Sequence, residues 1–195
     1  MNKLMGFFEL RELNIPTVYW KEFTPGTTLS KDLLWTIRSA VLSGDDQNLP
    51  RKVGALAEEA ADFALNLKKK YGESIMVIYY PFFIAKTSGT LQLFIDGYVI
   101  ECVEDDLWNL VTESKCDMTI INRDDDKRKV ITKKILSDEE IEEIEKVEKR
   151  IRISFRKELA SNESVLLEWS FAYNCDRNRN KVGEPYLVFY ECKTV

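Results

Sequence analysis

Hydrophobic and polar residues follow two different periods along the chain, which predicts a mixture of strands and helices. Segment 33–42, LLWTIRSAVL, joins β-branched, aromatic and small residues without a helical period, so we expect a strand that ends at the turn SGDDQNLP. Segments 74–85 and 89–103 are also rich in strand-forming residues, with the polar sequence KTSG at 86–89 between them. Because Asp96-Gly97 is a strong two-residue turn signal, these segments predict a strand followed by a hairpin.

Two other segments have the three-to-four-residue spacing of an amphipathic helix. The first covers 50–71, where Pro50 suits the first helical position, Gly72 follows the end, and the apolar face contains Leu56, Ala60, Phe63 and Leu67. The second covers 138 to about 159 and has an apolar face that runs from Ile141 to Phe155. Ser137 precedes Glu140 by three residues, which is the spacing of a capping box at the start of this helix.

The remaining apolar segments also predict strands. DMTIIN and KVITKKI flank the charged sequence RDDDKRK at 123–129, which is typical of an exposed loop or hairpin turn. The chain ends with VLLEWSFAY, the polar loop DRNRNKVGEP and YLVFYECKT, which predict two closing strands joined by a long loop. The order of the elements therefore indicates an α+β fold.

Composition and charge narrow the classes of function. The chain has 195 residues, of which 45% are hydrophobic, and this is enough for one core, so we expect a single domain over 1–195. The net charge of −5 provides no basic field for a nucleic-acid partner. The longest strongly apolar stretch, 75–84, is too short to cross a bilayer, so we expect a cytoplasmic protein with no membrane partner.

The sequence contains no histidine, which removes the commonest general base and the commonest transition-metal ligand. Its four cysteines form no CxxC pair, so we expect buried free thiols in a reducing compartment rather than a zinc site or a redox dithiol. Any catalysis would therefore depend on carboxylates, lysines, arginines and a hard metal ion bound by oxygen. The sequence assigns no catalytic residue.

Four charged residues lie within apolar segments that we expect to be strands. Arg38 would need an anionic partner if it faced inward, and phosphate is one because a guanidinium binds its oxygens bidentately. An inward-facing Glu168 would need a cation, and Mg²⁺ that holds nucleotide phosphates would satisfy it. Glu101 and Glu191 raise the same question. For all four, alternation that places the side chain in solvent is the reading that the pattern alone favours.

Two other features carry less information. Asp45 and Asp46 fit a solvated turn better than they fit a metal site. The eight glycines form neither a Walker loop nor a GxGxxG sequence, so no glycine-rich loop for phosphate is present.

Three blocks of sequence stand in a recognisable order. The first is WTIRSAVLSGDD, the second is IMVIYYPFFIAKTSGTLQLF followed by YVIECVEDDLWNLV, and the third contains KKILSDEEIEEIEKVEKRI, LLEWSFAY and PYLVFYECKT. Together they resemble the nucleotide-binding domain of the phosphoenolpyruvate synthase and pyruvate phosphate dikinase family. In that resemblance Arg38 matches an arginine that contacts ATP phosphates, Glu101 matches the acidic I-E block, and Glu168 matches the metal-binding glutamate of an I-E-W strand. The closing L-Q-x-R-P signature is absent, so Glu191 would have to replace its metal ligand.

The resemblance implies a compact ATP-grasp-like domain of α+β class, mainly antiparallel sheet with two long amphipathic helices. Its core would cover 33–195, after a divergent N-terminal segment at 1–32. ATP and Mg²⁺ are the implied cofactors, with Arg38 and Glu101 binding the nucleotide and Glu168 and Glu191 binding the metal. The implied partner is a separate subunit that carries a phosphohistidine or binds phosphoenolpyruvate.

Two functions follow from these observations. The first is an ATP-binding domain that acts as one component of a phosphotransfer system; any enzymatic activity would then be that of an ATP-dependent phosphotransferase of kinase type. The second is a non-catalytic derivative that acts as a regulatory or protein-interaction subunit, since several family signatures are absent. Tyr79, Tyr80, Phe82 and Phe83 are candidates for a partner interface, although packing in core strands is the use that the pattern favours.

Overall fold

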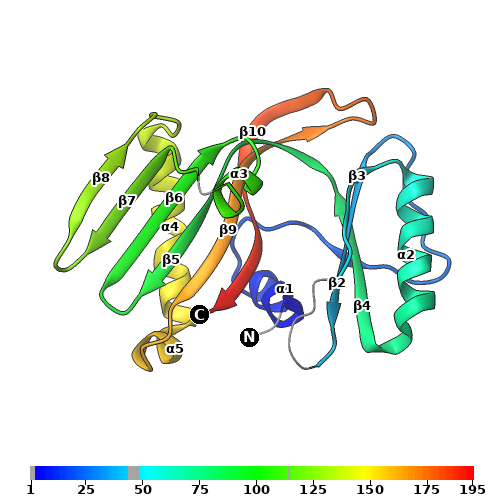
Figure 1. Ribbon diagram of the computed structural model, residues 1–195, viewed down its shortest axis with the longest axis horizontal. Coiled ribbons are helices and arrows are strands. Elements are labelled where there is room, and N and C mark those ends of the chain that lie inside the picture. Colours follow the sequence, from blue (N-terminus) through cyan, green and yellow to red (C-terminus); the bar gives the residue numbers. More distant parts are fainter. Residues whose placement is uncertain (1–2, 44–48, 114) are drawn as a thin grey trace.

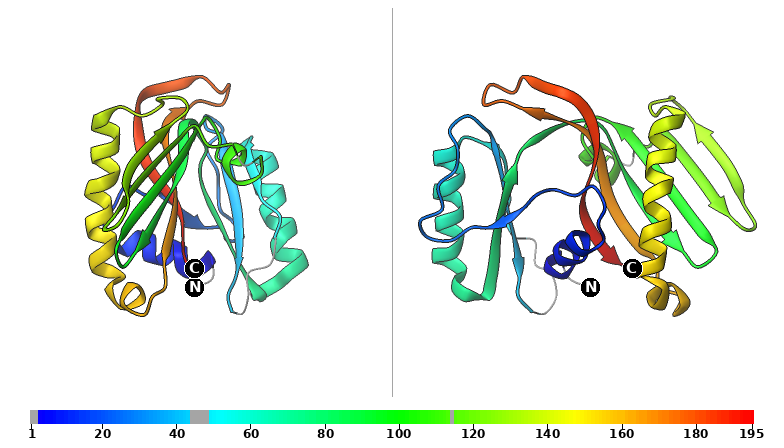
Figure 2. Two further views of the ribbon diagram at one scale, coloured as in Figure 1. Left: turned by 60° about the vertical axis from the view of Figure 1, so that its left-hand side comes forward. Right: turned by 180° about the vertical axis from the view of Figure 1, so that it is seen from behind.

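The computed structural model describes residues 3–43, 49–113 and 115–195. Within these ranges the strands form two antiparallel sheets, each with a long helix on its outer face (Figure 1). The views in Figure 2 show the first helix lying between the two sheets.

The larger sheet contains six of the described strands and has the order β10-β9-β5-β6-β7-β8. Its strands are β5 (Phe83–Phe94), β6 (Gly97–Glu104), β7 (Met118–Arg123), β8 (Lys127–Ile131), β9 (Val165–Cys175) and β10 (Lys181–Thr194). The turn between β5 and β6 contains Asp96, as expected, and the turn between β7 and β8 lies within RDDDKRK. The KTSG sequence does not interrupt a strand, however, because β5 runs through it and the break from the preceding strand lies at Phe82.

Helix α4 (Asp138–Ser154) covers one face of this sheet, and α5 (Arg156–Ala160) continues it after a break at Phe155. The predicted capping box is confirmed: the Ser137 side chain accepts a hydrogen bond from Glu140 N, and the Glu140 side chain accepts one from Ser137 N. The apolar face of α4 is buried against the sheet around the fully buried Trp169. This packing forms the largest core of the described part of the protein.

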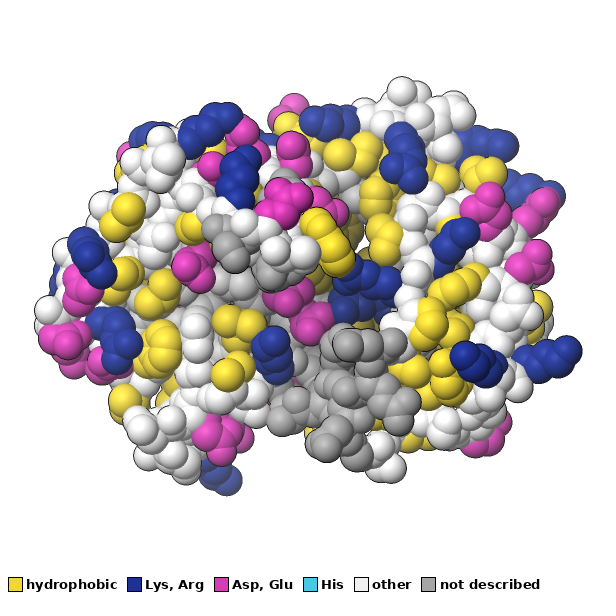
Figure 3. Space-filling view, in the orientation of Figure 1, with side chains coloured by type: hydrophobic (Ala, Val, Ile, Leu, Met, Phe, Trp, Pro, Cys, Tyr) yellow, Lys and Arg dark blue, Asp and Glu magenta, His cyan; other side chains and the backbone are white. Residues whose placement is uncertain are grey.

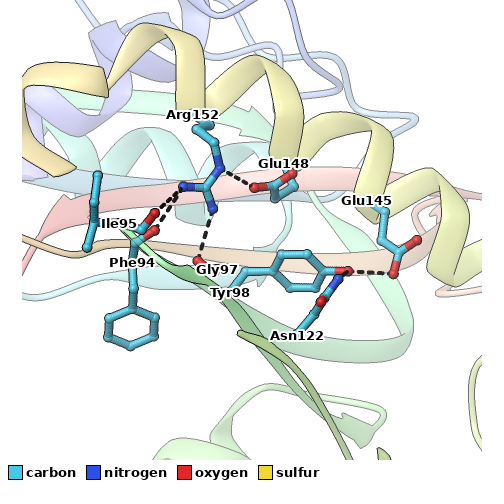
Figure 4. Close-up of polar contacts among 8 residues, drawn as sticks. All are labelled: Phe94, Ile95, Gly97, Tyr98, Asn122, Glu145, Glu148 and Arg152. Atoms are coloured by element: carbon cyan, nitrogen blue, oxygen red, sulfur yellow. Dashed lines mark hydrogen bonds and ion pairs between the residues drawn. The ribbon is translucent and has the colours of Figure 1, made fainter. Parts of the chain in front are cut away.

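Polar contacts fix α4 to the end of the β5–β6 hairpin (Figure 4). Arg152 donates hydrogen bonds to the carbonyl oxygens of Phe94, Ile95 and Gly97, and its Nε lies 2.7 Å from Glu148 Oε1. One guanidinium therefore holds together the helix and the turn, which gives α4 a fixed register on the sheet.

The smaller sheet contains four of the described strands in the order β1-β4-β2-β3. They are β1 (Lys21–Glu22), β2 (Trp35–Val41), β3 (Lys52–Ala55) and β4 (Ile75–Pro81), and α2 (Ala57–Tyr71) covers their outer face. The predicted helix start at Pro50 is wrong, because Lys52–Ala55 pairs with β2 and Gly54 has a φ of 63°. Pairing with a neighbouring strand outweighs local helix signals here. Gly72 ends the helix, as predicted.

A third apolar cluster lies between the sheets. It joins residues of α1 (Lys3–Glu12), the smaller sheet and the larger sheet, among them Phe7, Ile78 and Val188. Gly6 allows α1 to lie against β10, since a Cβ atom there would stand 2.1 Å from the carbonyl oxygen of Cys192. The two sheets are therefore joined by packing along one part of their interface.

These observations confirm the α+β class, the mainly antiparallel sheets and the two long amphipathic helices. All four cysteines are free thiols; three are buried and Cys116 is partly buried. No helix within the described ranges is long and apolar enough to span a membrane. The extent of the domain and its division at residue 33 stay predictions.

Candidate functional site

A cleft of about 570 Å³ opens between the two sheets, beside the cluster that joins them. It is lined by β2, β4 and β3 on one side and by β5, β9 and β10 on the other, and α3 (Trp108–Val111) lies at its edge. Basic and acidic side chains lie next to each other in the hollow at the centre of the face drawn in Figure 3. This cleft has the volume and the mixed lining of a small-molecule site.

Arg38 faces into this cleft and is 8% exposed, so the solvent-facing position that the pattern favoured is wrong. Every residue of β2 is buried, with Ile37 on the α2 side and Arg38 on the cleft side, so alternation of polar and apolar residues gave no guide. Arg38 Nη2 lies 2.5 Å from Glu191 Oε2, and Nη1 donates a 3.4 Å hydrogen bond to Tyr190 O. Burial lowers the pKa of Arg38, but Tyr80, Glu191 and Glu168 raise it by more, so the guanidinium stays charged.

The strand register places the three candidate glutamates in one row across the larger sheet. Glu191 pairs with Glu168, Glu168 pairs with Thr90, and Thr90 pairs with Glu101. Directly paired residues lie on the same face of a sheet, so these carboxylates share the face that borders the cleft. Glu168 and Glu191 line the cleft, whereas Glu101 is exposed, two strands from Glu168 and roughly 10 Å away by the usual strand spacing.

A register shift between Phe189 and Glu191 changes the direction of β10 beside the cleft. Both Tyr190 and Glu191 line the cleft as a result, although neighbours in a regular strand point to opposite faces. Arg38 contacts both residues, through the backbone of Tyr190 and the side chain of Glu191. The irregularity thus sets the contact between β10 and the arginine of the opposite sheet.

Buried hydroxyl groups form the floor of the cleft. Ser88 Oγ donates a 2.6 Å hydrogen bond to Asp105 O and shares a 2.8 Å hydrogen bond with Ser170 Oγ. Tyr190 Oη accepts from Ser170 at 3.5 Å, and burial raises the pKa of this phenol. Asp105 has a φ of 59°, a left-handed conformation that aspartate adopts more readily than most residues, and the Ser88 contact helps to fix it at the cleft.

The charges in the cleft are distributed unevenly. Arg38 on β2 and Arg51, just before β3, come from the half that contains the smaller sheet, and Arg179 comes from the turn between β9 and β10. The half that contains the larger sheet contributes the carboxylates of Asp105, Asp106, Glu168 and Glu191. A ligand in this cleft would meet cationic and anionic groups together, which suits a polyanion with a bound cation.

The structure brings together three of the four residues that the sequence singled out, namely Arg38, Glu168 and Glu191. It also places Phe82 and Phe83 on the lining of the cleft and buries Tyr80 beside Arg38, whereas Tyr79 packs against Trp35. Asp45 and Asp46 lie outside the described residues. The sequence analysis did not identify four residues that line the cleft, namely Ser170, Tyr190, Asp105 and Arg179. Strand register and turn geometry bring these residues to the cleft, and no sequence motif predicts either.

Comparison with known proteins relates this chain to others by fold only. No family model matches the chain, and no curated protein matches its sequence. A solved structure that matches is the macrocyclase MdnC of Microcystis aeruginosa MRC, bound with precursor peptide MdnA, with a TM-score of 0.50 and 9% sequence identity. The likeness covers 97% of this chain but 50% of that chain, so the protein spans about half of MdnC. It confirms the compact ATP-grasp-like fold.

The resemblance to the phosphoenolpyruvate synthase and pyruvate phosphate dikinase family is wrong, because no family model matches and the matching fold is that of a macrocyclase. The kinase-type activity and the phosphohistidine or phosphoenolpyruvate subunit that it implied find no support in these comparisons. The motifs behind it are short. IRSA and LLEW each place one charged residue in an apolar strand, and this pattern arises wherever an antiparallel sheet borders a polar cleft.

Proposed function

We propose that the cleft between the two sheets binds a nucleoside triphosphate, ATP in the first instance, together with Mg²⁺. The observation that carries the proposal is the position of Arg38, whose buried guanidinium contacts Glu191 and interacts electrostatically with Glu168 in the cleft. The ATP-grasp-like fold supports it independently. A buried arginine and a pair of neighbouring carboxylates together suit phosphate oxygens and a divalent cation.

The residues of the cleft fit such a ligand. Among the described residues no group of three or more Asp, Glu or Cys could hold a metal ion by itself. Mg²⁺ prefers one or two carboxylates, with phosphate oxygens and water as its other ligands, so Glu168 and Glu191 form a suitable partial set. The metal would neutralise charge on the polyphosphate. Arg38 has five N–H donors and can keep Glu191 while it binds a phosphate oxygen.

Apolar side chains suit the nucleoside part of the ligand. Phe83 and Trp108 line the cleft, and Trp108 is 52% exposed at its edge. Stacking on an aromatic ring contributes about 1–3 kcal/mol for a nucleobase in single-strand binding proteins, so these side chains could contribute substantially to affinity.

The test is isothermal titration of the protein with ATP in the presence and absence of Mg²⁺. We expect affinity in the micromolar to millimolar range that increases with Mg²⁺, and we expect Glu168→Gln to remove most of that increase. Glu163→Gln, an exposed residue in the loop before β9, is the matched control. An absence of heat at millimolar ATP would overturn the proposal. Glu101→Gln measures whether the exposed Glu101 contacts the nucleotide, which stays a prediction.

The likeness to MdnC also supports a polypeptide as partner, because that macrocyclase is bound with a precursor peptide. We expect a partner peptide to bind more tightly when Mg-ATP occupies the cleft. A pull-down from native extract with and without Mg-ATP, repeated with Arg38→Met, tests this. Capture that is independent of both nucleotide and Arg38 would contradict the link between the partner and the cleft.

A further inference from the structure

The turn that joins β9 to β10 is held in one conformation by Asp176. Its Oδ1 accepts hydrogen bonds from Asn178 N at 2.8 Å and Asn180 N at 2.9 Å, and its Oδ2 accepts from Asn180 Nδ2 at 2.8 Å. The N–H of Arg177 donates a 3.1 Å hydrogen bond to Asp32 O, in the segment before β2. This exposed turn is therefore held by hydrogen bonds within itself and by one hydrogen bond to the segment before β2. It extends from the larger sheet toward the smaller one (Figure 1).

Arg179 occupies the centre of this turn in an unfavourable backbone conformation. Its φ is 63°, and a left-handed conformation costs a residue with a Cβ atom roughly 1–2 kcal/mol. Asparagine and aspartate adopt it readily, and Arg179 is the one long side chain among the described non-glycine residues with positive φ. Strain of this kind is found preferentially at functional positions.

The strained conformation directs the guanidinium across the mouth of the cleft. Arg179 Nη2 donates a 3.3 Å hydrogen bond to Gly54 O on β3, and the guanidinium lies 5.5 Å from the centre of the Phe82 ring. Gly54 is a close neighbour, since a Cβ atom there would stand 3.1 Å from Arg179 Nη2. The side chain therefore spans the two halves of the protein at a point that lines the cleft.

We infer that Arg179, with Arg51 of the same cleft lining, forms an anion subsite at the mouth of the cleft that takes the terminal phosphates of a polyphosphate ligand. The inference rests on the proposed nucleotide function and adds a second phosphate contact to that of Arg38. The hydrogen bond to Gly54 is long and uses one of five N–H donors, so the guanidinium is positioned and retains donors for phosphate oxygens.

The chemistry of the position suits the oxygens of a phosphate group. The planar fork of a guanidinium matches two phosphate oxygens, and the Arg179 guanidinium lies over the Phe82 ring, 5.5 Å from its centre. Arg51 is exposed and lines the same cleft, which adds a second positive charge to the lining. A nucleoside monophosphate would place its single phosphate at Arg38 in the interior of the cleft. It would not contact Arg179 at the mouth.

The experiment compares three probes, ATP, AMP and inorganic tripolyphosphate, each titrated with Mg²⁺ into the wild type and Arg179→Gly. Glycine adopts the positive φ without strain, so this variant keeps the turn, and its melting temperature is expected to equal or exceed that of the wild type. We expect its affinities for ATP and tripolyphosphate to fall on the order of tenfold, as for the loss of one charge-assisted hydrogen bond, with AMP unchanged. Arg177→Ala removes the same charge from the same turn outside the cleft lining and is the matched control.

Each result decides one of the two proposals. Equal affinities in the wild type and Arg179→Gly, or an equal loss in Arg177→Ala, would overturn the anion subsite while leaving the nucleotide function standing. If the wild type binds tripolyphosphate but not ATP, and Arg179→Gly loses the affinity for tripolyphosphate, the result would support the anion subsite and contradict the nucleotide function. A wild type that binds none of the three probes would overturn both.

Discussion

Arg38 on β2 and Glu191 on β10 form an ion pair that links the two sheets, with Nη2 and Oε2 2.5 Å apart. Their side chains are 10% and 13% exposed, so each charge depends on the other for compensation. We expect Glu191→Met to lower the free energy of unfolding by about 3–5 kcal/mol, because it leaves a buried guanidinium without its partner. Urea unfolding measures this.

A matched set of variants separates the ion pair from simple loss of contacts. The double variant Arg38→Met with Glu191→Met should be more stable than Glu191→Met alone, since apolar residues of similar size can replace a buried pair. Glu58→Ala, which removes the exposed pair with Lys31, should change stability little. A Glu191→Met variant as stable as Glu58→Ala would contradict the compensation of charge in the cleft.

Gly89 on β5 leaves room for the ring of Trp169 on the neighbouring strand. A Cβ atom at Gly89 would stand 2.5 Å from Cζ2 of Trp169 and 2.2 Å from the carbonyl oxygen of Glu101. We therefore expect Gly89→Ala to destabilise the protein by about 1–3 kcal/mol through overpacking, measured by thermal or urea unfolding. Ser161→Ala at an exposed position is the control, with an expected change below about 0.5 kcal/mol.

Arg152 joins α4 to the β5–β6 turn through three backbone carbonyl groups (Figure 4). We expect Arg152→Lys to lower the free energy of unfolding by about 1–2 kcal/mol, because an ammonium group cannot reproduce the fork that reaches these carbonyls and Glu148 together. The same change at the exposed Arg156 should have no measurable effect in urea unfolding. Equal stability of the two variants would argue against the clamp.

Tyr98 predicts a decline of stability at alkaline pH. Burial, together with the hydrogen bond to Glu145, raises the pKa of Tyr98 from 10.0 to about 12, although Asn122 opposes the shift. A raised folded-state pKa means that the folded protein holds this proton more tightly than the unfolded chain. The contribution of Tyr98 to the free energy of unfolding is therefore complete below pH 10, and it is lost as the pH rises from 10 toward 12.

The measurement is urea unfolding at several pH values between 8 and 12 for the wild type and Tyr98→Phe. We expect Tyr98→Phe to be less stable than the wild type at pH 8. We also expect it to lose less stability than the wild type between pH 8 and pH 12. Tyr19→Phe, at a side chain that is 77% exposed, should follow the wild-type curve. Parallel curves for the wild type and Tyr98→Phe would show that another group causes any alkaline decline.

The sequence by itself determined most of the elements and the class of the fold. The capping box at Ser137, the turn at Asp96 and the apolar segment 165–173 are local signals, and each produced the expected helix start, turn or strand. Hydrophobic periodicity works here because the outer helices and the larger sheet each bury one face. The helix start expected at Pro50 was wrong, because residues 52–55 pair with β2 as β3 and the helix begins at Ala57.

The site was decided by tertiary structure. Sequence alone favoured a solvent-facing Arg38, which is wrong, because every residue of its strand is buried and alternation cannot distinguish the two faces. Strand register brought Glu168 and Glu191 together, and the irregularity in β10 set the Arg38 contact. Arg179 reached the cleft only through the geometry of a turn. The contacts of Arg38 and Arg179 join residues more than a hundred positions apart, so they depend on long-range packing that no local pattern encodes.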